Sequence, residues 1–172
     1  MCTNTGLSEA PRSNEELALG LINDAWNGGN IEAYRTYVHD DVVTHLAGYP
    51  EPLQGLDAVM AWAYRYHAAF PDIHIDVDEH FADGDRVCVR WTSRQTHTGT
   101  YIGIPASGKQ ASITAVQLLH FDAGKVREAW LMFDPLRVMQ QLGVFPVGDP
   151  PRVAVAVLKL LTRLSRLAPK PN

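Results

Sequence analysis

The fold is decided by residues 73–97, which read IHIDVDEHFADGDRVCVRWTSRQTH. Apolar and polar side chains alternate along residues 73–81 and again along residues 87–97. This period of two predicts two β-strands, each with one face toward water. The Asp-Gly-Asp at residues 83–85 predicts a hairpin turn, so we expect the two strands to pair in antiparallel fashion.

The alternation continues toward the C-terminus. A loop at residues 99–109 is rich in turn residues, and strands are expected at residues 112–121 and 125–133. The Ala-Gly at 123–124 predicts the turn between them, and a short helix is expected over residues 135–142.

Three helices are expected before this run of strands. Ser13 and Glu16 have the spacing of a capping box, which starts the first helix, and the glycines at 28–29 end it. The second helix is expected over residues 31–38. The third covers residues 56–70, where one face carries the apolar side chains.

Helices followed by a meander of strands indicate an α+β class rather than a βαβ order. With a brief strand at residues 42–46, we expect a cone-shaped, curved antiparallel sheet wrapped over the three N-terminal helices, an α+β barrel, plus a C-terminal helix. The domain is expected to span residues 13–148, after a disordered N-terminus at residues 1–12. A cavity between sheet and helices is where a site would form.

Residues 149–172 are expected to form a basic amphipathic extension. Beyond residue 149 the chain carries five basic residues and no acidic one, which leaves the first 149 residues with a net charge of −9. The apolar residues of this segment fall on one helical stripe. Three interpretations stay open: a helix docked on the acidic body or on a dimer partner, a helix on a membrane surface, or disorder.

Composition excludes several classes of function. A net charge of −4 and a pI near 5.9 give no general attraction for nucleic acid. A disulfide between Cys2 and Cys88 is not expected, and a reduced, cytoplasmic setting fits better. Residues 1–12 show no secretion signal, and no run of about 18 apolar residues occurs, so stable membrane insertion is not expected either.

Three patterns that resemble functional motifs are better explained as structural features. Residues 103–109 match the spacing of a phosphate-binding loop, but Gln110 replaces the required Ser or Thr and the loop joins two strands. Two histidines and two aspartates between residues 74 and 80 share one strand face, yet that face is the solvated one. Cys88 lies between valines of a strand and is expected to be a sheet residue. No metal and no nucleotide are therefore expected.

Polar side chains on otherwise apolar faces are the better functional candidates. Gln117 shares strand parity with buried-type residues, His67 shares a helix face with them, and His45 shares parity with Val43. Asp134 ends the last strand. Buried polar groups cost free energy unless they find partners, so we expect these four to converge on the cavity. Asp134 has an alternative role as the cap of the final helix.

The sequence resembles the SnoaL-like polyketide cyclase family over roughly residues 14–146. The resemblance is carried by HTGTYIGIPASGK at 97–109, FDAGKVREAW at 121–130 and the closing QQLG at 140–143. It implies the cone-shaped fold of the nuclear transport factor superfamily, a homodimer, and cofactor-free chemistry on polyketide-like substrates. Relatives in this family also carry out hydroxylation, epoxide opening, isomerisation or pericyclic ring closure.

The resemblance also implies an aldol mechanism whose two groups are absent here. In the members that close a ring by aldol addition, an aspartate on the last long strand acts with a histidine on the neighbouring strand. Aligned through the Gly-Lys at 124–125, the aspartate falls on Leu131 and the histidine on Gln117. A ring closure driven by substrate shape, with little acid/base help, is therefore a serious variant.

The predicted function is a cofactor-independent cyclase or isomerase acting on a hydrophobic, carbonyl-bearing intermediate. Asp134 and His45 are predicted to handle protons, and Gln117 to polarise a carbonyl or hydroxyl group. The cavity walls are predicted to include Trp91, Trp130, His67 and His97. One alternative is a non-catalytic module that binds a hydrophobic metabolite or assembles a complex. Another is a hydroxylase-type member or an epoxide hydrolase using Arg90 and Asp134.

Overall fold

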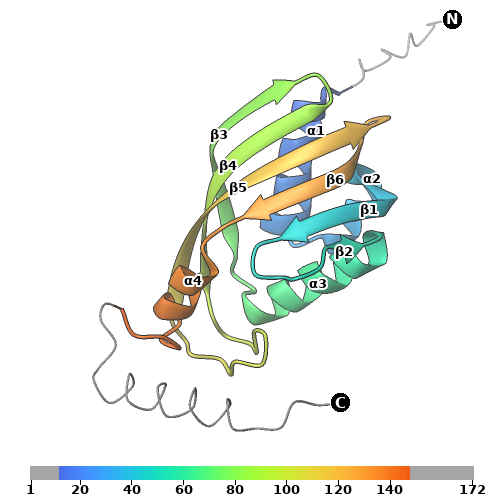
Figure 1. Ribbon diagram of the computed structural model, residues 1–172. Coiled ribbons are helices and arrows are strands. Elements are labelled where there is room, and N and C mark those ends of the chain that lie inside the picture. Colours follow the sequence, from blue (N-terminus) through green and yellow to red (C-terminus); the bar gives the residue numbers. More distant parts are fainter. Residues whose placement is uncertain (1–11, 148–172) are drawn as a thin grey trace, which may run out of the picture.

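A computed structural model describes residues 12–147 of the chain. One curved sheet covers the helices α1, α2 and α3, which all lie against its concave side (Figure 1). The short helix α4 lies at the opposite end of the long strands from α1. The expected disorder before residue 12 and the expected basic extension fall outside the described residues, apart from Arg12 itself.

The helical part is more irregular than the sequence indicates. Helix α1 (Asn14–Leu21) begins at the predicted capping box, in which Ser13 Oγ accepts from the Glu16 N–H at 3.2 Å. It runs directly into a π-helix, η1 (Ile22–Asn27), which ends at Gly28 as predicted. The second expected helix is a 3₁₀ turn, η2 (Ile31–Ala33), followed by a single turn, α2 (Tyr34–Tyr37). The third is α3 (Leu56–Ala69).

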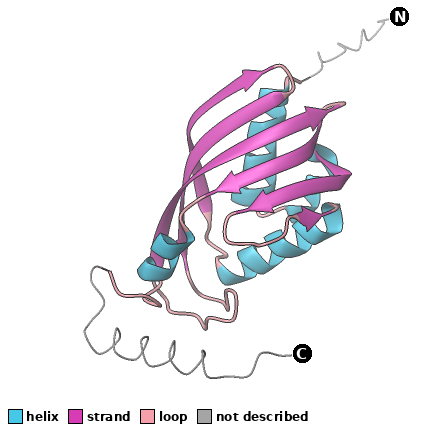
Figure 2. Ribbon diagram, in the orientation of Figure 1, coloured by secondary structure: helices cyan, strands magenta, loops and turns pink. Residues whose placement is uncertain are grey.

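Six strands form one mixed sheet in the order β2-β1-β6-β5-β4-β3 (Figure 2). Their bounds are β1 (Val38–Leu46), β2 (Leu53–Gln54), β3 (His74–Asp83), β4 (Arg86–Thr96), β5 (Gln110–Asp122) and β6 (Lys125–Met132). The predicted meander from β3 to β6 is antiparallel throughout. Helix α4 (Pro135–Gln141) follows the last strand, as expected.

One pairing corrects the expectation of an antiparallel sheet. Strand β1 lies parallel to β6, in a register that pairs His45 with Trp130 and Leu46 with Leu131. A parallel pair needs a long crossover connection, and the chain between β1 and β6 supplies it through α3 and the meander. The sheet is curved but not closed, because β2 and β3 remain its two edges. The cone-shaped α+β architecture is otherwise confirmed.

Alternating burial sets the two faces of the sheet. Along β4, Val87, Val89 and Trp91 are buried, whereas Arg90 is exposed between them. The face away from the helices carries ion pairs, such as the one between Arg90 Nη1 and Asp78 Oδ2 at 3.0 Å. Asp76 and Asp78 of β3 lie on this outer face, as predicted. The prediction is wrong for His80, because a bulge between Val77 and Glu79 pairs His80 with the inward-facing Val89, where it contacts Glu15 of α1. Within residues 12–147 no cluster of three potential metal-ligating side chains occurs.

Two apolar clusters fill the space between sheet and helices. The larger one joins the inner face of the sheet to α1, η1 and α3. The smaller one lies at the α4 end and contains Phe70, Ile113 and Val138. Tyr66 and Phe133 pack against both clusters. None of the helices in the described part of the chain is long and apolar enough to cross a membrane.

Candidate functional site

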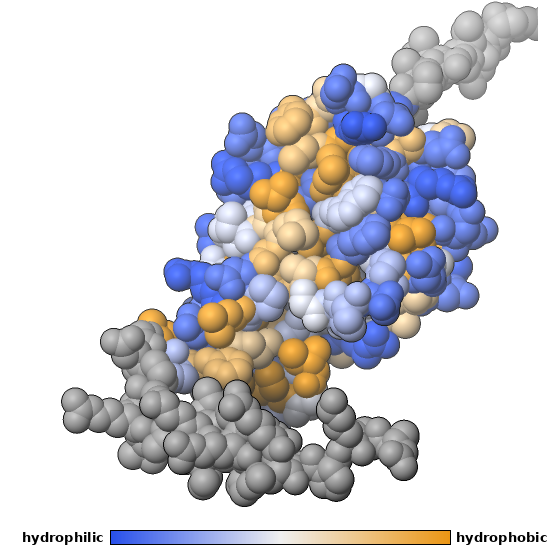
Figure 3. Space-filling view, viewed as in Figure 1, coloured by the Kyte–Doolittle hydropathy of each residue, from blue (hydrophilic) through white to orange (hydrophobic). Residues whose placement is uncertain are grey.

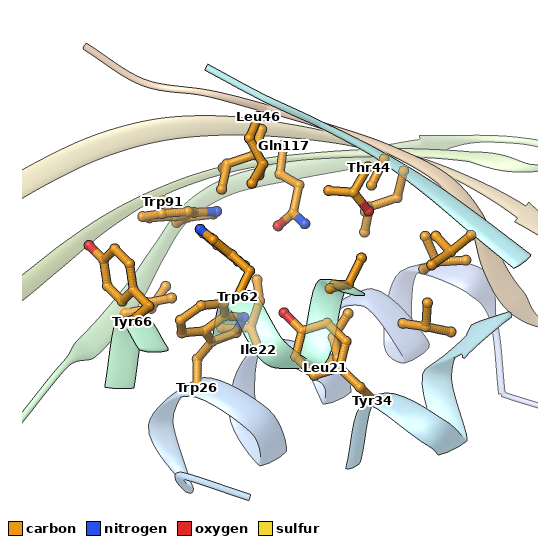
Figure 4. A pocket seen from close by; sticks show the side chains of 18 of the residues that line it. Leu21, Ile22, Trp26, Tyr34, Thr44, Leu46, Trp62, Tyr66, Trp91 and Gln117 are labelled. Atoms are coloured by element: carbon orange, nitrogen blue, oxygen red, sulfur yellow. The ribbon is translucent and has the colours of Figure 1, made fainter. Parts of the chain in front are cut away.

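A cavity lies between the concave face of the sheet and the helices, where the sequence predicts it (Figure 4). Its volume is about 60 Å³. The walls are almost entirely apolar. The residues that line the cavity are Leu21, Ile22, Trp26, Tyr34, Val38, Val42, Thr44, Leu46, Val59, Trp62, Tyr66, Ile73, Ile75, Trp91, Ile113, Gln117, Leu119, Val126, Ala129, Leu131 and Phe133.

The helical wall is aromatic because of the spacing of its residues. Val59, Trp62 and Tyr66 follow one another at three- and four-residue intervals, which places all three on one face of α3. From the π-helix, Trp26 meets Trp62 edge-to-face with ring centroids 5.5 Å apart. A π-turn widens the helix locally and is often found at functional sites. Here it gives the cavity one wall of large, rigid rings.

The sheet wall supplies the polar atoms of the cavity. Gln117 lies on the inner face of β5 and has no side-chain hydrogen bond to the residues that the structure describes. Trp91 lies on the neighbouring strand, and its buried Nε1–H likewise has no partner there. In Figure 4 the amide of Gln117 and the nitrogen edge of Trp91 both point into the cavity. These groups can donate hydrogen bonds to an oxygen atom of a bound molecule.

The ionisable side chains that line the cavity are phenols. Burial raises the pKa of Tyr34, and a hydrogen bond from Trp26 offsets this only in part. Burial also raises the pKa of Tyr66. Both phenols are therefore neutral at pH 7. No Asp, Glu, His, Lys or Arg is among the described residues that line the cavity.

His45 and Trp130 lie on the other face of the sheet. His45 Nε2 is 2.9 Å from Glu128 Oε1, and its ring stacks on Trp130 with centroids 4.9 Å apart. Thr44 and Leu46, the neighbours of His45 in β1, line the cavity instead. The parity predicted for His45 and Val43 is correct, but the face assigned to them is wrong. The expectation that His45 and Trp130 face the cavity is corrected accordingly.

Asp134 caps helix α4 and is exposed. Its Oδ1 accepts from the Arg137 N–H at 3.0 Å, and Pro135 occupies the first helical turn. This is the alternative role that the Asp-Pro sequence allows. Asp134 is not among the residues that line the cavity, so the expected proton-handling pair of Asp134 and His45 is not brought together there.

The two other predicted histidines, the half-buried His67 and the buried His97, are not among the residues that line the cavity. His67 stacks behind Trp26, with ring centroids 5.2 Å apart. Partial burial lowers the pKa of His67, so its imidazole is neutral at pH 7. His97 is fully buried and borders the smaller apolar cluster, where its ring lies 5.2 Å from that of Phe70. Of the seven predicted site residues, Gln117 and Trp91 line the cavity.

The position of Arg90 argues against the epoxide hydrolase alternative. Arg90 lies on the outer face of β4, in ion pairs with Asp78 and Glu79. It cannot orient water in the cavity from there.

The sequence analysis did not identify the aromatic residues of α3 as part of the site. Trp62 lies three positions after Val59 and four before Tyr66, so their spacing on the predicted helix carried a signal that could have found them.

Comparison with known proteins supports this architecture. The family profile described as SnoaL-like polyketide cyclase matches residues 16–142. A protein described as a SnoaL-like polyketide cyclase, from Jannaschia sp. CCS1, has 23% identity and a TM-score of 0.72, covering 80% of this chain and 100% of that one. Among curated proteins none matches the chain significantly.

Two Streptomyces proteins show similar agreement. The proposed hydroxylase AclR from Streptomyces galilaeus has 27% identity and a TM-score of 0.69, covering 89% of this chain and 94% of that one. IdmH from Streptomyces antibioticus, described as a proposed polyketide cyclase, has 26% identity and a TM-score of 0.67, covering 77% and 99% respectively. With the profile match covering most of its length, the chain belongs to the SnoaL-like polyketide cyclase family.

Proposed function

We propose that the chain is an enzyme that closes or isomerises a ring in a hydrophobic, carbonyl-bearing intermediate of the polyketide type. One observation carries this proposal. The amide of Gln117 lies in an apolar cavity without a hydrogen-bond partner in the described part of the chain, next to the free Nε1–H of Trp91. The buried Nε1–H of Trp91 is costly to leave unpaired, and a ligand oxygen that accepts from it could also accept from the half-buried amide of Gln117.

The walls suggest how the reaction is promoted. Rigid aromatic side chains can hold a flexible chain in a folded shape that brings two of its carbons together. The N–H groups of Gln117 and Trp91 can stabilise negative charge that develops on a carbonyl oxygen during ring closure. In such a step the C=C π pair of the substrate's own enol forms the new carbon–carbon bond, the π bond of the attacked carbonyl breaks, and the enol proton passes to the new hydroxyl oxygen, so no group leaves. The product is therefore an isomer of the substrate.

The cavity favours a reaction that needs no strong base from the protein. Its ionisable lining groups are the neutral phenols of Tyr34 and Tyr66, which can donate hydrogen bonds but do not act as bases near pH 7. This supports the variant in which substrate shape, more than proton transfer, drives ring closure. The family resemblance adds the expectation that no cofactor takes part.

The same observation also favours a second candidate. Among residues 12–147 no basic or acidic side chain lines the cavity, which suits a protein that binds a hydrophobic metabolite and releases it unchanged. The two candidates differ in what becomes of the ligand, so a single incubation distinguishes them.

The test is an in vitro incubation with a minimal polyketide synthase that releases linear poly-β-ketone chains. Products are separated and weighed by liquid chromatography and mass spectrometry, with wild-type protein, with the Gln117→Leu variant and without either. A ring-closed isomer that appears only with the wild type supports the enzyme. Linear chains that bind to the protein and are recovered unchanged favour the binding module. An identical product pattern in all three incubations, without bound ligand, excludes both.

The resemblance also implies a homodimer, and the outer face of the sheet offers a surface for it. Apolar side chains form a band across this face (Figure 3). Val116 and Met132 are register partners there, with 40% and 58% of their surface exposed. Packing a second copy against this band would bury both. Sedimentation of the wild type and of Val116→Glu tests this assignment, because a charge at a packed two-fold interface should give monomers.

A further inference from the structure

The inner face of β4 carries an unusual row of unsatisfied polar atoms. Five buried side-chain N or O atoms lack a hydrogen-bond partner within residues 12–147, and four of them come from this strand and its direct continuation. They are Trp91 Nε1, Ser93 Oγ, Gln95 Oε1 and His97 Nε2. Native proteins pair nearly all such atoms, with protein, water or ligand. We call these four residues the β4 polar row.

The β4 polar row begins in the cavity and runs away from it. Trp91 lines the cavity, and Ser93 pairs in register with Ile113, which also lines it. Gln95 and His97 follow at two-residue steps on the same inner side, with exposures of 3% and 0%. At about 3.4 Å per residue, the row extends over roughly 20 Å from Trp91 to His97. It ends beside the smaller apolar cluster.

Hydrogen bonds fix which chemistry His97 offers. Its Nδ1 accepts from the Ser107 N–H at 3.2 Å and lies 3.1 Å from Ser107 Oγ. A neutral imidazole that accepts at Nδ1 carries its proton on Nε2. The buried, unpartnered Nε2 of His97 is therefore a donor.

The other members of the row are neutral as well. Ser93 Oγ can donate or accept, and the amide of Gln95 keeps one free polar atom because only its Nε2 is bonded, to Tyr66. The β4 polar row thus suits uncharged oxygen functions, such as ketones and hydroxyls. A carboxylate would find no counter-charge in it.

Tyr66 lies between the cavity and the far part of the β4 polar row, Gln95 and His97. It lines the cavity and packs against both apolar clusters. Its hydroxyl accepts from Gln95 Nε2 at 2.6 Å. In Figure 4 this hydroxyl points away from the part of the cavity that holds Gln117. Rotation of one side chain would therefore join the cavity to the row.

The small volume of the cavity favours such an extension. At about 60 Å³ it is smaller than the roughly 150 Å³ cavity that is known to hold one benzene molecule. A polyketide-type ligand needs more room than this. The unsatisfied atoms beyond Tyr66 lie where additional room would bring new hydrogen bonds, whereas the other walls are apolar.

We propose that the β4 polar row is an extension of the binding cavity that takes the oxygen functions at the far end of an uncharged, elongated, oxygenated ligand, with Tyr66 as the movable partition. This assignment rests on the proposed function of the cavity. It names the ligand class by two features: no charge at the inner end, and an oxygen function there.

Two probes test the assignment by titration calorimetry. One is a linear methyl ketone of thirteen carbons, and the other is the same chain with a second keto group at its far end. The wild type should bind the diketone about tenfold more tightly, because one or two hydrogen bonds are added at the inner end. The variants Ser93→Ala and Gln95→Met should reduce this preference to about twofold or less while keeping the affinity for the monoketone. Ser112→Ala, an exposed position on the outer face of β5, should keep the full preference.

Thermal unfolding without ligand provides the second measurement. Gln95→Met also removes the hydrogen bond from Gln95 Nε2 to Tyr66, so its Tm does not test the role of the row. If the polar row serves a ligand, Ser93→Ala should leave the Tm unchanged or raise it, since it removes an unsatisfied buried atom. A structural role would lower the Tm instead. Equal affinity for the two ketones, or a preference that both variants keep, would contradict the proposed extension but not the proposed binding role of the cavity. Failure of both ketones to bind counts against the cavity and the extension together. Should Gln95→Met fail to fold, Ser93→Ala decides the question alone.

Discussion

Gln117 of β5 and Leu131 of β6 are partners in the antiparallel register, and both side chains line the cavity. These are the two positions at which the family resemblance leads us to expect a histidine and an aspartate. The structure therefore keeps the neighbouring arrangement of that pair but fills it with an amide and an alkyl group. Hydrogen bonding is still possible at this point of the wall, whereas proton abstraction is not.

The first prediction concerns the amide of Gln117. Gln117→Leu should lower kcat for ring closure by about 10²–10³-fold, the usual cost of removing one donor to a developing oxyanion. Its free energy of unfolding should stay the same or rise, because an unpaired amide is replaced by an alkyl group of similar size. Steady-state kinetics and urea unfolding measure the two effects. Gln54→Leu, the same change at an exposed position of β2, is the control and should alter neither. Full activity of Gln117→Leu would remove the amide from the mechanism.

The second prediction concerns the position where the resemblance expects a carboxylate. Leu131 is 8% exposed, so Leu131→Asp should lower the free energy of unfolding at pH 7 by about 3–5 kcal/mol. Burial would raise the pKa of the new carboxyl above its unfolded value of about 3.9. The folded state then binds more protons than the unfolded state between these two pKa values. Part of the lost stability should therefore return as the pH falls from 7 toward 4.

Leu131→Asn separates the effect of the charge from that of the lost side-chain volume. It should show the volume cost without the pH-dependent part, in urea titrations at pH 7 and pH 4. Turnover of Leu131→Asp should not rise if substrate shape drives the reaction. A marked gain in rate would show that the chemistry lacks only a base, against the mechanism proposed above.

The sequence predicts a site residue correctly where the alternation of apolar and polar residues clearly distinguishes the buried face of a strand from the exposed one. Trp91 shares parity with Val87 and Val89, and Gln117 shares parity with Ala115 and Leu119, so the pattern predicts that both side chains point inward. The segment VVTHL of β1 is different, because both of its faces carry an apolar residue. Parity groups His45 with Val43 correctly, but the choice of the buried face depends on packing against α3.

Other features depend on tertiary contacts that a local pattern does not contain. The π-helix η1 changes which residues of the first helix face the sheet, and no residue type in its sequence, INDAWN, predicts it. The parallel pairing of β1 with β6 joins segments about 85 residues apart, and periodicity within either strand does not indicate which strands pair. The sequence predicts the N-caps of α1 and α4. Ser13 is followed three positions later by Glu16, as in a capping box, and Asp134 directly precedes Pro135 at the start of α4.

The third prediction concerns Asp134, which the sequence offered both as an acid and as a cap. Asp134→Ala should lower the free energy of unfolding by about 0.5–2 kcal/mol, because the Arg137 N–H loses its acceptor. Asp134→Asn should be nearly neutral, since Asn caps about as well as Asp. Both variants should keep the turnover of the folded wild type. If Asp134→Asn loses turnover while its Tm is unchanged, the carboxylate takes part in the chemistry after all.

The fourth prediction concerns the acid side of the stability curve. Burial lowers the pKa of His67 below its unfolded value of about 6.5, so the folded state holds this ring neutral at a pH where the unfolded chain already protonates it. The unfolded state then binds more protons, and stability must fall as the pH drops through 6.5 toward the folded pKa. In His67→Phe an aromatic ring can still stack on Trp26, but the titratable imidazole is removed. The difference in free energy of unfolding between variant and wild type should therefore shift in favour of the variant between pH 7 and pH 5, measured by urea unfolding. A difference that stays constant over this range would mean that His67 is as free to take up a proton in the folded protein as in the unfolded chain.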